Sequence, residues 1–203
     1  MAADYGYTSI ASTWDDSYVY ERVEYWLAQK QANTVFELGC GNGHTVKRLL
    51  ERGFEVTAIE SSESGGALAQ KLCPSARIEI CSVYEDLAAR FSQYDAVVSV
   101  EVVEHLYDPK LFAQRCFEVL KPGGFALIST PYHGYLKNLA IALAGKWDSH
   151  HAPLWDHGHI KFFSRATLSQ LFAEQGLTLK TFERLGRVPI LAKSMLGVFQ
   201  KPL

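Results

Sequence analysis

Five short apolar runs, separated by segments of helical periodicity, constrain the fold of this chain more than any other feature. Each run is four or five residues long and rich in β-branched or aromatic side chains. Such runs are typical of strands that are buried on both faces of a sheet. They occupy residues 34–38, 55–59, 77–80, 96–100 and 125–129. Strands that alternate with amphipathic helices predict a doubly wound α/β sheet with right-handed crossovers.

The two ends of the chain depart from this alternation. Residues 16–31 are expected to form one helix before the first strand. After Arg165, a helix that stops at Gly176 precedes two further apolar runs, residues 177–185 and 195–200. These two runs are too close for a crossover helix, so we expect them to pair antiparallel at the edge of the sheet.

The composition is that of a single globular domain, which we expect to span residues 1–203. Hydrophobic residues make up 48% of the chain and charged residues 21%, which excludes a disordered or collagen-like chain. The net charge of −2 gives no bulk positive field for nucleic acid or anionic lipid. The four cysteines form no CxxC pair and are expected to be free thiols. Neither a signal peptide nor a transmembrane segment is predicted, so we expect a cytoplasmic location.

A glycine-rich loop, ELGCGNGH at residues 37–44, leads from the first predicted strand into a helix. Glycines allow a tight turn and the close approach of a ligand, and the helix N-terminus supplies free N–H groups. The spacing is G-x-G-x-G, unlike the G-x-G-x-x-G of dinucleotide-binding loops. The carboxylate of Glu37 would also repel a pyrophosphate. The loop therefore favours a cationic ligand with an amino group and a sulfonium over a nicotinamide dinucleotide.

Glu60 ends the second predicted strand, 21 residues (60 − 39) after Gly39. An acidic residue at this position can accept hydrogen bonds from two ribose hydroxyls. On its own, a glycine-rich loop can also serve only close packing of the chain. A glutamate at the end of a strand is likewise often only solvated. Their combination in this order predicts a cofactor that contains a nucleoside.

These segments resemble the class I S-adenosylmethionine-dependent methyltransferases. The resemblance is carried by ELGCGNG at 37–43, AIE at 58–60 and LKPGG at 120–124. With VEVVEHLYDP at 100–109, the chain is similar to the ubiquinone-biosynthesis O-methyltransferase group. The resemblance implies a Rossmann-like methyltransferase fold, a seven-stranded sheet that is mostly parallel with an antiparallel edge strand.

The resemblance also implies how S-adenosyl-L-methionine is bound. The loop glycines would line its methionine part, and the acid after the second strand would take the ribose. Where the family often has an Asp on the adenine amino group, this chain has Ser82, and Tyr84 would either cover the adenine or pack under the sheet. The predicted cofactor-binding residues are Glu37, Gly39, Cys40, Gly41, Gly43, Glu60, Ser61, Ser82, Val83, Tyr84, Val100 and Glu101.

Three polar residues, Glu101, Glu104 and His105, follow the fourth predicted strand. Their spacing of i, i+3 and i+4 would set them on one face of a helical turn, beyond the sheet edge where such folds bind ligands. Two carboxylates and an imidazole suit a divalent metal. The pattern E-x-x-E-H resembles the ubiquinone-pathway enzymes and the small-RNA 3′-terminal 2′-O-methyltransferases. In the latter a later His joins the metal, and the segment HIKFFSR nominates His159.

Three interpretations of these residues stay open. In the first, Glu101, Glu104, His105 and His159 hold Mg²⁺ or Mn²⁺ together with an acceptor hydroxyl. In the second, His105 or His159 is a catalytic general base and no metal is used. In the third, the acids are stabilised by a helix dipole and the histidines only bind backbone carbonyls.

Two segments are expected to enclose the site. Residues 131–164 form an insert that we expect to wall the substrate pocket, and residues 136–143 within it form a short helix that either covers the domain or touches a membrane surface. At the N-terminus, within residues 1–31, aromatic side chains would form a lid over the cofactor. The insert histidines are His133, His150, His151, His157 and His159, and the lid residues are Tyr5, Tyr7, Trp14 and Tyr18.

The sequence thus predicts an S-adenosylmethionine-dependent methyltransferase that acts on a hydroxyl of a small molecule, such as a phenol or quinol. A metal-dependent 2′-O-methyltransferase on an RNA terminus is an alternative, which the net charge of −2 disfavours. A non-catalytic cofactor-binding module is another, although such a module needs no second polar constellation. Nothing in the sequence indicates an oligomeric state.

Overall fold

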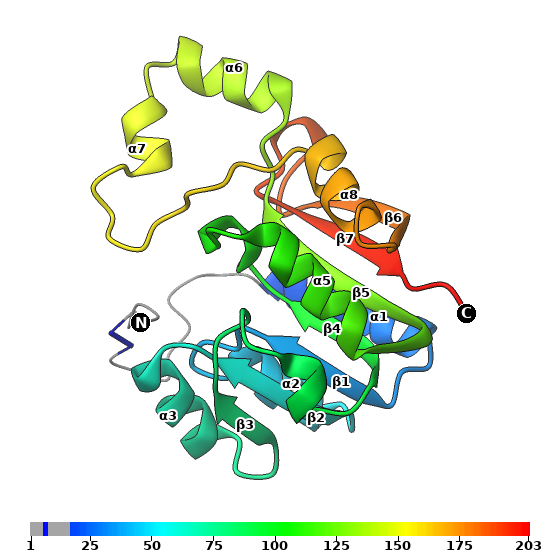
Figure 1. Ribbon diagram of the computed structural model, residues 1–203. Helices are drawn as coiled ribbons and strands as arrows, with labels where there is room; N and C mark the ends of the chain where they lie inside the picture. Colours follow the sequence, from blue (N-terminus) through cyan, green and yellow to red (C-terminus); the bar gives the residue numbers. More distant parts are fainter. Residues whose placement is uncertain (1–5, 8–16) are drawn as a thin grey trace.

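A computed structural model describes residues 6–7 and 17–203 of the protein (Figure 1). Seven strands form one sheet in the order β3-β2-β1-β4-β5-β7-β6. β1 to β5 run parallel, whereas β7 is antiparallel to both β5 and β6. The strands are β1 Thr34–Leu38, β2 Glu55–Glu60, β3 Arg77–Ile80, β4 Tyr94–Ser99, β5 Leu120–Pro131, β6 Thr178–Leu185 and β7 Ser194–Gln200.

Helices cover both faces of this sheet. In Figure 1, α5 and α8 lie in front of it and α1 lies behind. The α-helices are α1 Ser17–Gln29, α2 His44–Glu51, α3 Glu63–Leu72, α4 Leu87–Arg90, α5 Pro109–Val119, α6 Tyr135–Leu143, α7 Trp147–His151 and α8 Arg165–Ala173. Two 3₁₀ turns are η1 Val103–His105 and η2 Pro189–Leu191. None of the described helices combines the length and the apolar character needed to cross a membrane.

The predicted doubly wound α/β sheet is confirmed, and the expected antiparallel pair is formed by β6 and β7. This antiparallel pair lies at one edge of the sheet, as predicted, with β6 outermost. β7 lies between β5 and β6 and pairs with β5 along almost its whole length, from Phe125↔Gln200 to Pro131↔Ser194.

The bounds of β2, β6 and β7 differ from the sequence prediction by one residue at one end, and those of two other strands differ by more. β4 covers Tyr94–Ser99 instead of 96–100, and β5 covers Leu120–Pro131 instead of 125–129. The additional residues of β5 include LKPGG, which has no strand-like pattern of apolar side chains. β4 extends the strand at this end by pairing Tyr94 with Leu120, and β7 extends the other end as far as Pro131, so backbone pairing overrides local propensity.

Two apolar cores hold the layers together. On one face, side chains such as Phe112 of α5 and Phe172 of α8 pack with Phe36 of β1. On the other, Leu27 of α1 packs with Val35 of the same strand. Neighbouring residues of β1 thus serve opposite cores, as the alternation of side chains along a strand requires. All four cysteines are buried and free, as predicted.

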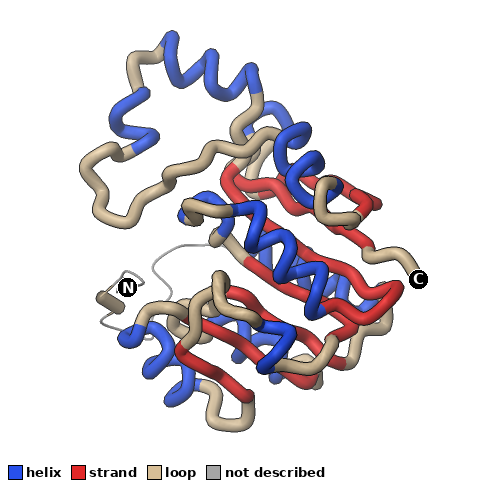
Figure 2. Tube along the Cα trace, in the orientation of Figure 1, coloured by secondary structure: helices blue, strands red, loops and turns tan. Residues whose placement is uncertain are grey.

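The insert leaves the sheet after β5 and returns to it at α8. Figures 1 and 2 show α6 and α7 on an arm that stands away from the sheet. The predicted helix over residues 136–143 is confirmed as α6, and none of its residues is buried. We call residues 132–164 the arm.

The carboxylate of Asp95 ties three strands together at the end of the sheet opposite the arm. Its Oδ2 accepts hydrogen bonds from the N–H groups of Asn33 and Thr34, at 3.0 and 2.9 Å. Its Oδ1 accepts from Lys121 Nζ at 2.7 Å. Partial burial opposes the charge of Asp95, but the hydrogen bonds from Lys121, Thr34 and Asn33 outweigh it and hold its pKa well below the usual range.

We expect Asp95→Asn to lower the free energy of unfolding by about 1–2 kcal/mol at pH 7, because it removes charge-assisted hydrogen bonds. A depressed pKa in the folded state stabilises the protein above the unfolded pKa of about 3.9. The difference between wild type and variant should therefore shrink as the pH falls below about 4. Urea unfolding at several pH values measures it. Asp148→Asn, at an exposed position on α7, is the control, and an equal effect of both substitutions would contradict the assignment.

Candidate functional site

A cavity of about 830 Å³ opens at the C-terminal ends of β1 to β4. This is the edge at which open α/β sheets bind ligands, and the volume is in the usual range for small-molecule sites. Most of the predicted cofactor-binding residues line it. They are Glu37, Gly39, Cys40, Gly41, Glu60, Ser61, Ser82, Val83, Tyr84, Val100 and Glu101.

Gly43 is the predicted cofactor residue that does not line the cavity. It has a φ of +88°, and a Cβ atom there would lie 2.9 Å from the Cα atom of Ala69 on α3. The backbone of the loop therefore passes too close to α3 for any side chain. Gly43 thus allows the α2 N-terminus to pack closely against α3, and its contact with the cofactor stays a prediction.

Glu60 connects the glycine loop to the end of β2. Its side chain is buried, and its Oε2 accepts a hydrogen bond from the N–H of Gly41 at 2.7 Å. Its Oε1 accepts from the N–H of Ser62 at 2.8 Å. A carboxylate has about four lone-pair positions, so Glu60 retains acceptor capacity toward a ligand in the cavity.

Glu37 lies at the floor of the cavity and is 1% exposed. Burial raises the pKa of its carboxyl group to about 8; a hydrogen bond with Thr45 opposes this rise and the negative charge of Glu60 adds to it. Glu37 is therefore mainly protonated at pH 7. A cation bound beside it would favour the ionised form.

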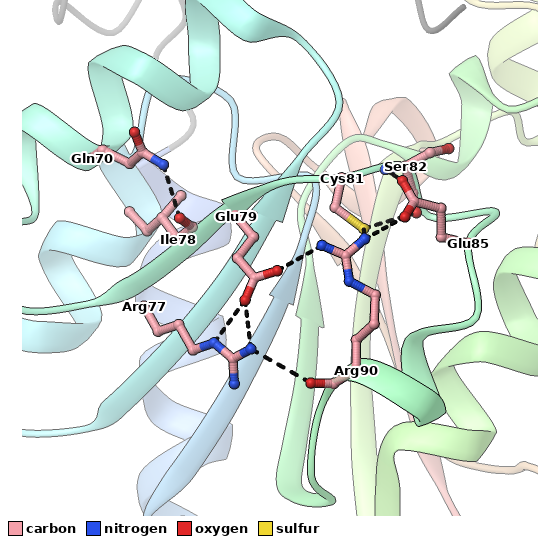
Figure 3. A network of polar contacts seen from close by, with 8 residues as sticks. All are labelled: Gln70, Arg77, Ile78, Glu79, Cys81, Ser82, Glu85 and Arg90. Atoms are coloured by element: carbon pink, nitrogen blue, oxygen red, sulfur yellow. Dashed lines mark hydrogen bonds and ion pairs between the residues drawn. The ribbon is translucent and has the colours of Figure 1, made fainter.

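The loop after β3 is held by a chain of ion pairs. Figure 3 shows Arg90 between two carboxylates, with Glu79 Oε2 at 2.7 Å and Glu85 on its other side. Glu85 in turn accepts a hydrogen bond from the N–H of Ser82 at 3.0 Å. Further along this loop, the hydroxyl of Tyr84 accepts from the N–H of Asp108 at 3.1 Å, which joins this wall of the cavity to the start of α5.

The spacing predicted that Glu101 shares a helical turn with Glu104 and His105, and this prediction is wrong. The turn begins at Val103, and Glu101 has a φ of +53°, a region that side-chain-bearing residues seldom adopt. Ser129 of β5 holds this conformation. Its Oγ accepts from the N–H of Glu101 at 3.0 Å and donates to Glu101 Oε1 at 2.9 Å.

Glu104, His105 and His159 meet next to the cavity. One ligand atom from each lies within 4.8 Å of the other two, and Glu104 Oε1 is 4.0 Å from Nε2 of each histidine. The N–H groups of Ile160 and Lys161 both donate to the carbonyl oxygen of Glu104 at 2.9 Å. These backbone bonds bring the end of the arm, and with it His159, to η1.

Both histidines of this group are in a state that suits metal binding or base catalysis. Burial lowers the pKa of His105, and burial together with the charge of His105 lowers the pKa of His159 to about 4. The Nδ1 of His105 lies 2.9 Å from the carbonyl oxygen of His157. A carbonyl can only accept, so Nδ1 carries the proton and Nε2 keeps its lone pair toward Glu104.

The remaining insert histidines separate into another cluster. The rings of His133 and His151 are 5.7 Å apart, and both contact Phe162 at about 5 Å, 5.1 and 5.0 Å respectively. Of the five insert histidines, His157 lines the cavity. The last part of the arm therefore lines the cavity, whereas His133, His150 and His151 form ring contacts with one another or with Phe162 and do not line it. That the arm walls a substrate pocket stays a prediction.

Two of the four residues predicted for the N-terminal lid lie in the described part of the chain. Tyr7 lines the cavity, and its N–H donates to Ser64 Oγ at 2.9 Å. Tyr18 instead packs on the β6–β7 connection, with its hydroxyl 3.3 Å from Ser194 Oγ. The other two lid residues, Tyr5 and Trp14, lie outside the described residues.

Several cavity residues were not predicted from the sequence. His44 and Thr45 follow the glycine loop directly, so extending that motif by one helical turn finds them. Asn42 lies inside the motif itself, and most of the others adjoin predicted residues along the chain, as Ile59 adjoins Glu60. Tyr20 comes from a distant element, α1, and carries no local signal. The residues missed are Tyr20, Asn42, His44, Thr45, Ile59, Cys81, Val102, Leu106, Tyr107, Gly158 and Ile160.

Known proteins resemble this chain in sequence and in fold. The family model described as a methyltransferase domain matches residues 14–181. A ubiquinone biosynthesis O-methyltransferase of Chromobacterium violaceum is 28% identical over 160 residues, which cover 77% of this chain and 69% of that protein. Two further proteins of that name, each 30% identical, are covered over 59% and 61% of their length.

Solved structures of methyltransferases have the same architecture. A putative methyltransferase from Bacillus halodurans superposes with a TM-score of 0.73 at 13% identity, over 91% of this chain and 99% of that one. The 1,6-didemethyltoxoflavin-N1-methyltransferase of Burkholderia thailandensis, with S-adenosylhomocysteine bound, superposes with a TM-score of 0.68 at 17% identity, over 95% and 82%. By the family match over most of its length, the chain belongs to the methyltransferase domain family.

Proposed function

We propose that this protein transfers a methyl group from S-adenosylmethionine to a hydroxyl of a small, phenol- or quinol-like molecule. One observation carries the proposal. A single cavity is lined by the neutral carboxyl of Glu37, the acceptor Glu60 and, at its other end, His105. The cofactor is supported by the S-adenosylhomocysteine in the Burkholderia structure, and the hydroxyl acceptor by the O-methyltransferase relatives.

The cofactor would bind along the edge of β1 to β3. Glu37 complements the positive charge of the methionine part, since ionisation in a buried site is favoured by a nearby cation. Glu60 accepts from the ribose hydroxyls with the lone pairs that Gly41 and Ser62 leave. The loop around Ser82, which Glu85 and Arg90 hold in place, contacts the adenine.

The reaction is an in-line displacement at the methyl carbon. An acceptor oxygen attacks that carbon, the carbon–sulfur bond breaks, and its electron pair returns to sulfur to give the neutral thioether. The acceptor proton leaves to a base or to solvent. The protein contributes by orienting the two reactants and excluding water, and the lone pair of His105 Nε2 can take the proton.

A divalent cation such as Mg²⁺ or Mn²⁺ fits the group of Glu104, His105 and His159. The group combines a carboxylate with two imidazoles that burial keeps neutral, which is a ligand set for such metals. When bound, the ion would lower the pKa of the acceptor hydroxyl and orient it. Glu101, the fourth residue of the predicted site, would have to exchange its hydrogen bond with Ser129 to join them.

Binding of the cofactor should release a proton from Glu37. With a pKa of about 8 the group is protonated at pH 7, and the bound cation lowers that pKa. We expect close to one proton to be released at pH 7, and none from Glu37→Gln. Calorimetry with S-adenosylmethionine in buffers of different ionisation enthalpy counts these protons. Equal release by both proteins would exclude Glu37 as the partner of the cation.

Glu60→Ala should weaken binding of S-adenosylhomocysteine at least tenfold, because it removes the acceptor of the ribose and loosens the glycine loop. Each tenfold loss corresponds to about 1.4 kcal/mol. The affinity is measured by calorimetry, with thermal unfolding as a check on the fold. Glu63→Ala, an exposed glutamate in the next turn, should bind like wild type. Wild-type affinity of Glu60→Ala would refute the ribose assignment.

Glu104→Gln should abolish binding of Mn²⁺ while it preserves the shape of this buried side chain. Electron paramagnetic resonance of free Mn²⁺ measures the binding without any methyl acceptor. Chelation of the wild type should remove activity and leave the affinity for S-adenosylhomocysteine unchanged. If no Mn²⁺ binds and activity survives chelation, the group acts without metal and His105 or His159 is the base.

A further inference from the structure

Ser129, near the C-terminal end of β5, forms two hydrogen bonds with one residue, Glu101. Its Oγ accepts from the N–H of Glu101 at 3.0 Å and donates to Glu101 Oε1 at 2.9 Å. Ser129 is 1% exposed, so its hydroxyl is shielded from water. β4 and β5 pair as far as Ser99 and Ile128, which places Ser129 beside the turn that follows β4. We call these two residues the Ser129–Glu101 pair.

The pair stabilises an unusual backbone conformation. Glu101 has a φ of +53°, and such a conformation persists only where the surrounding structure holds it. The chain passes through this turn from β4 into η1. Val102 then packs on the glycine loop, since a Cβ atom at Gly39 would lie 2.7 Å from Val102 Cγ2. The turn thus sets the start of η1, which carries Glu104 and His105.

The pair also keeps the Glu101 carboxylate apart from a neighbouring set of ligands. We call Glu104, His105 and His159 the metal group. One ligand atom from each lies within 4.8 Å of the other two, and among the described residues this set does not include Glu101. Glu101 nevertheless lines the same cavity as His105, and three residues separate them along the chain. The carboxylate is therefore close to the metal group but bonded elsewhere.

Charge favours this separation as long as no cation is bound. Beside Glu104, the carboxylate of Glu101 would meet a second carboxylate, and like charges at short range repel each other. In its present position it acts on a cation, Lys137 of α6. Burial lowers the pKa of Lys137 to about 8, the charge of Arg187 adds to this, and the negative charge of Glu101 opposes it. A divalent cation would reverse the balance, because carboxylates and neutral imidazoles are ligands for it.

We propose that Ser129 is a positioning residue that sets the metal affinity of the site by competing for the carboxylate of Glu101. With Glu101 in the Ser129–Glu101 pair, the metal group offers three side-chain ligands and leaves a position for the acceptor hydroxyl, as catalytic metal sites commonly do. Glu101 can become a fourth ligand only by giving up the hydrogen bonds from Ser129. This inference rests on the metal that we proposed above for the methyl transfer.

Binding of Mn²⁺ to the full chain tests the proposal without cofactor or methyl acceptor. We expect Ser129→Ala to bind Mn²⁺ at least tenfold more tightly than the wild type, because Glu101 no longer gives up hydrogen bonds to join the metal group. The gain should vanish when Glu101→Gln is added, since the amide lacks the charge that attracts the ion. Electron paramagnetic resonance of free Mn²⁺ measures all four proteins of this cycle.

Ser99→Ala is the matched control. Ser99 is also 1% exposed, at the end of the neighbouring strand β4, and its hydroxyl donates to the carbonyl oxygen of Leu38 at 2.8 Å. We expect both alanine variants to lower the melting temperature by about 2–4 °C, the effect of one lost hydrogen bond in a chain of this length. Only Ser129→Ala should change the affinity for Mn²⁺, whereas a merely structural role would affect both variants alike.

Unchanged or weaker Mn²⁺ binding by Ser129→Ala overturns the proposal, and so does a gain that persists after Glu101→Gln is added. Absence of Mn²⁺ binding from both the wild type and Ser129→Ala overturns it as well. Calorimetry with S-adenosylhomocysteine on the same proteins separates this proposal from the methyl transfer. A chain that fails to bind S-adenosylhomocysteine, but gains Mn²⁺ affinity in Ser129→Ala, would refute the proposed cofactor and support the role of Ser129.

Discussion

The cavity depends on the hydrogen bonds that the buried side chain of Glu60 accepts. It accepts hydrogen bonds from the N–H groups of Gly41 and Ser62 and so joins the ends of the neighbouring strands β1 and β2. The carbonyl oxygen of Ile59 reinforces this junction by accepting from the N–H groups of Gly39 and Cys40. Burial raises the pKa of the neighbouring Glu37 to about 8, and the negative charge of Glu60 adds to this rise, so Glu37 stays protonated until a cation arrives.

Backbone hydrogen bonds alone form a second junction, between η1 and the last part of the arm, beside His105. The carbonyl oxygen of Glu104 accepts from both Ile160 and Lys161, residues that follow the whole length of the arm. The two hydrogen bonds need no particular side chain at residues 160 and 161. They nevertheless decide which histidine meets Glu104, because they set the position of His159 one residue earlier. The group of Glu104, His105 and His159 is thus formed by η1, the last part of the arm and the carbonyl oxygen of Glu104 that joins them.

Much of this could be predicted from the sequence, and the exceptions have a common cause. β1 was predicted to the residue because a strand buried on both faces carries its own apolar signal. The glycine loop and Glu60 were found because close approach and charge demand particular residue types. The orientation of Glu101 was not predicted, since it depends on Ser129, a residue of a different strand. Tyr20 and Ile160 likewise reach the cavity through tertiary contacts alone.

The arm carries both the exposed helix α6 and His159, which lies next to the cavity. It begins at β5, where the N–H of Tyr132 donates to the carbonyl oxygen of Lys193 at 2.9 Å, and it ends at the carbonyl oxygen of Glu104. Between these anchors it buries little, and the aromatic contacts of His133 and His151 with Phe162 hold it together. Segments with few buried contacts open at low cost in free energy. Since α6 and His159 lie on this one segment, contacts made by α6 and the position of His159 beside Glu104 are parts of the same local equilibrium.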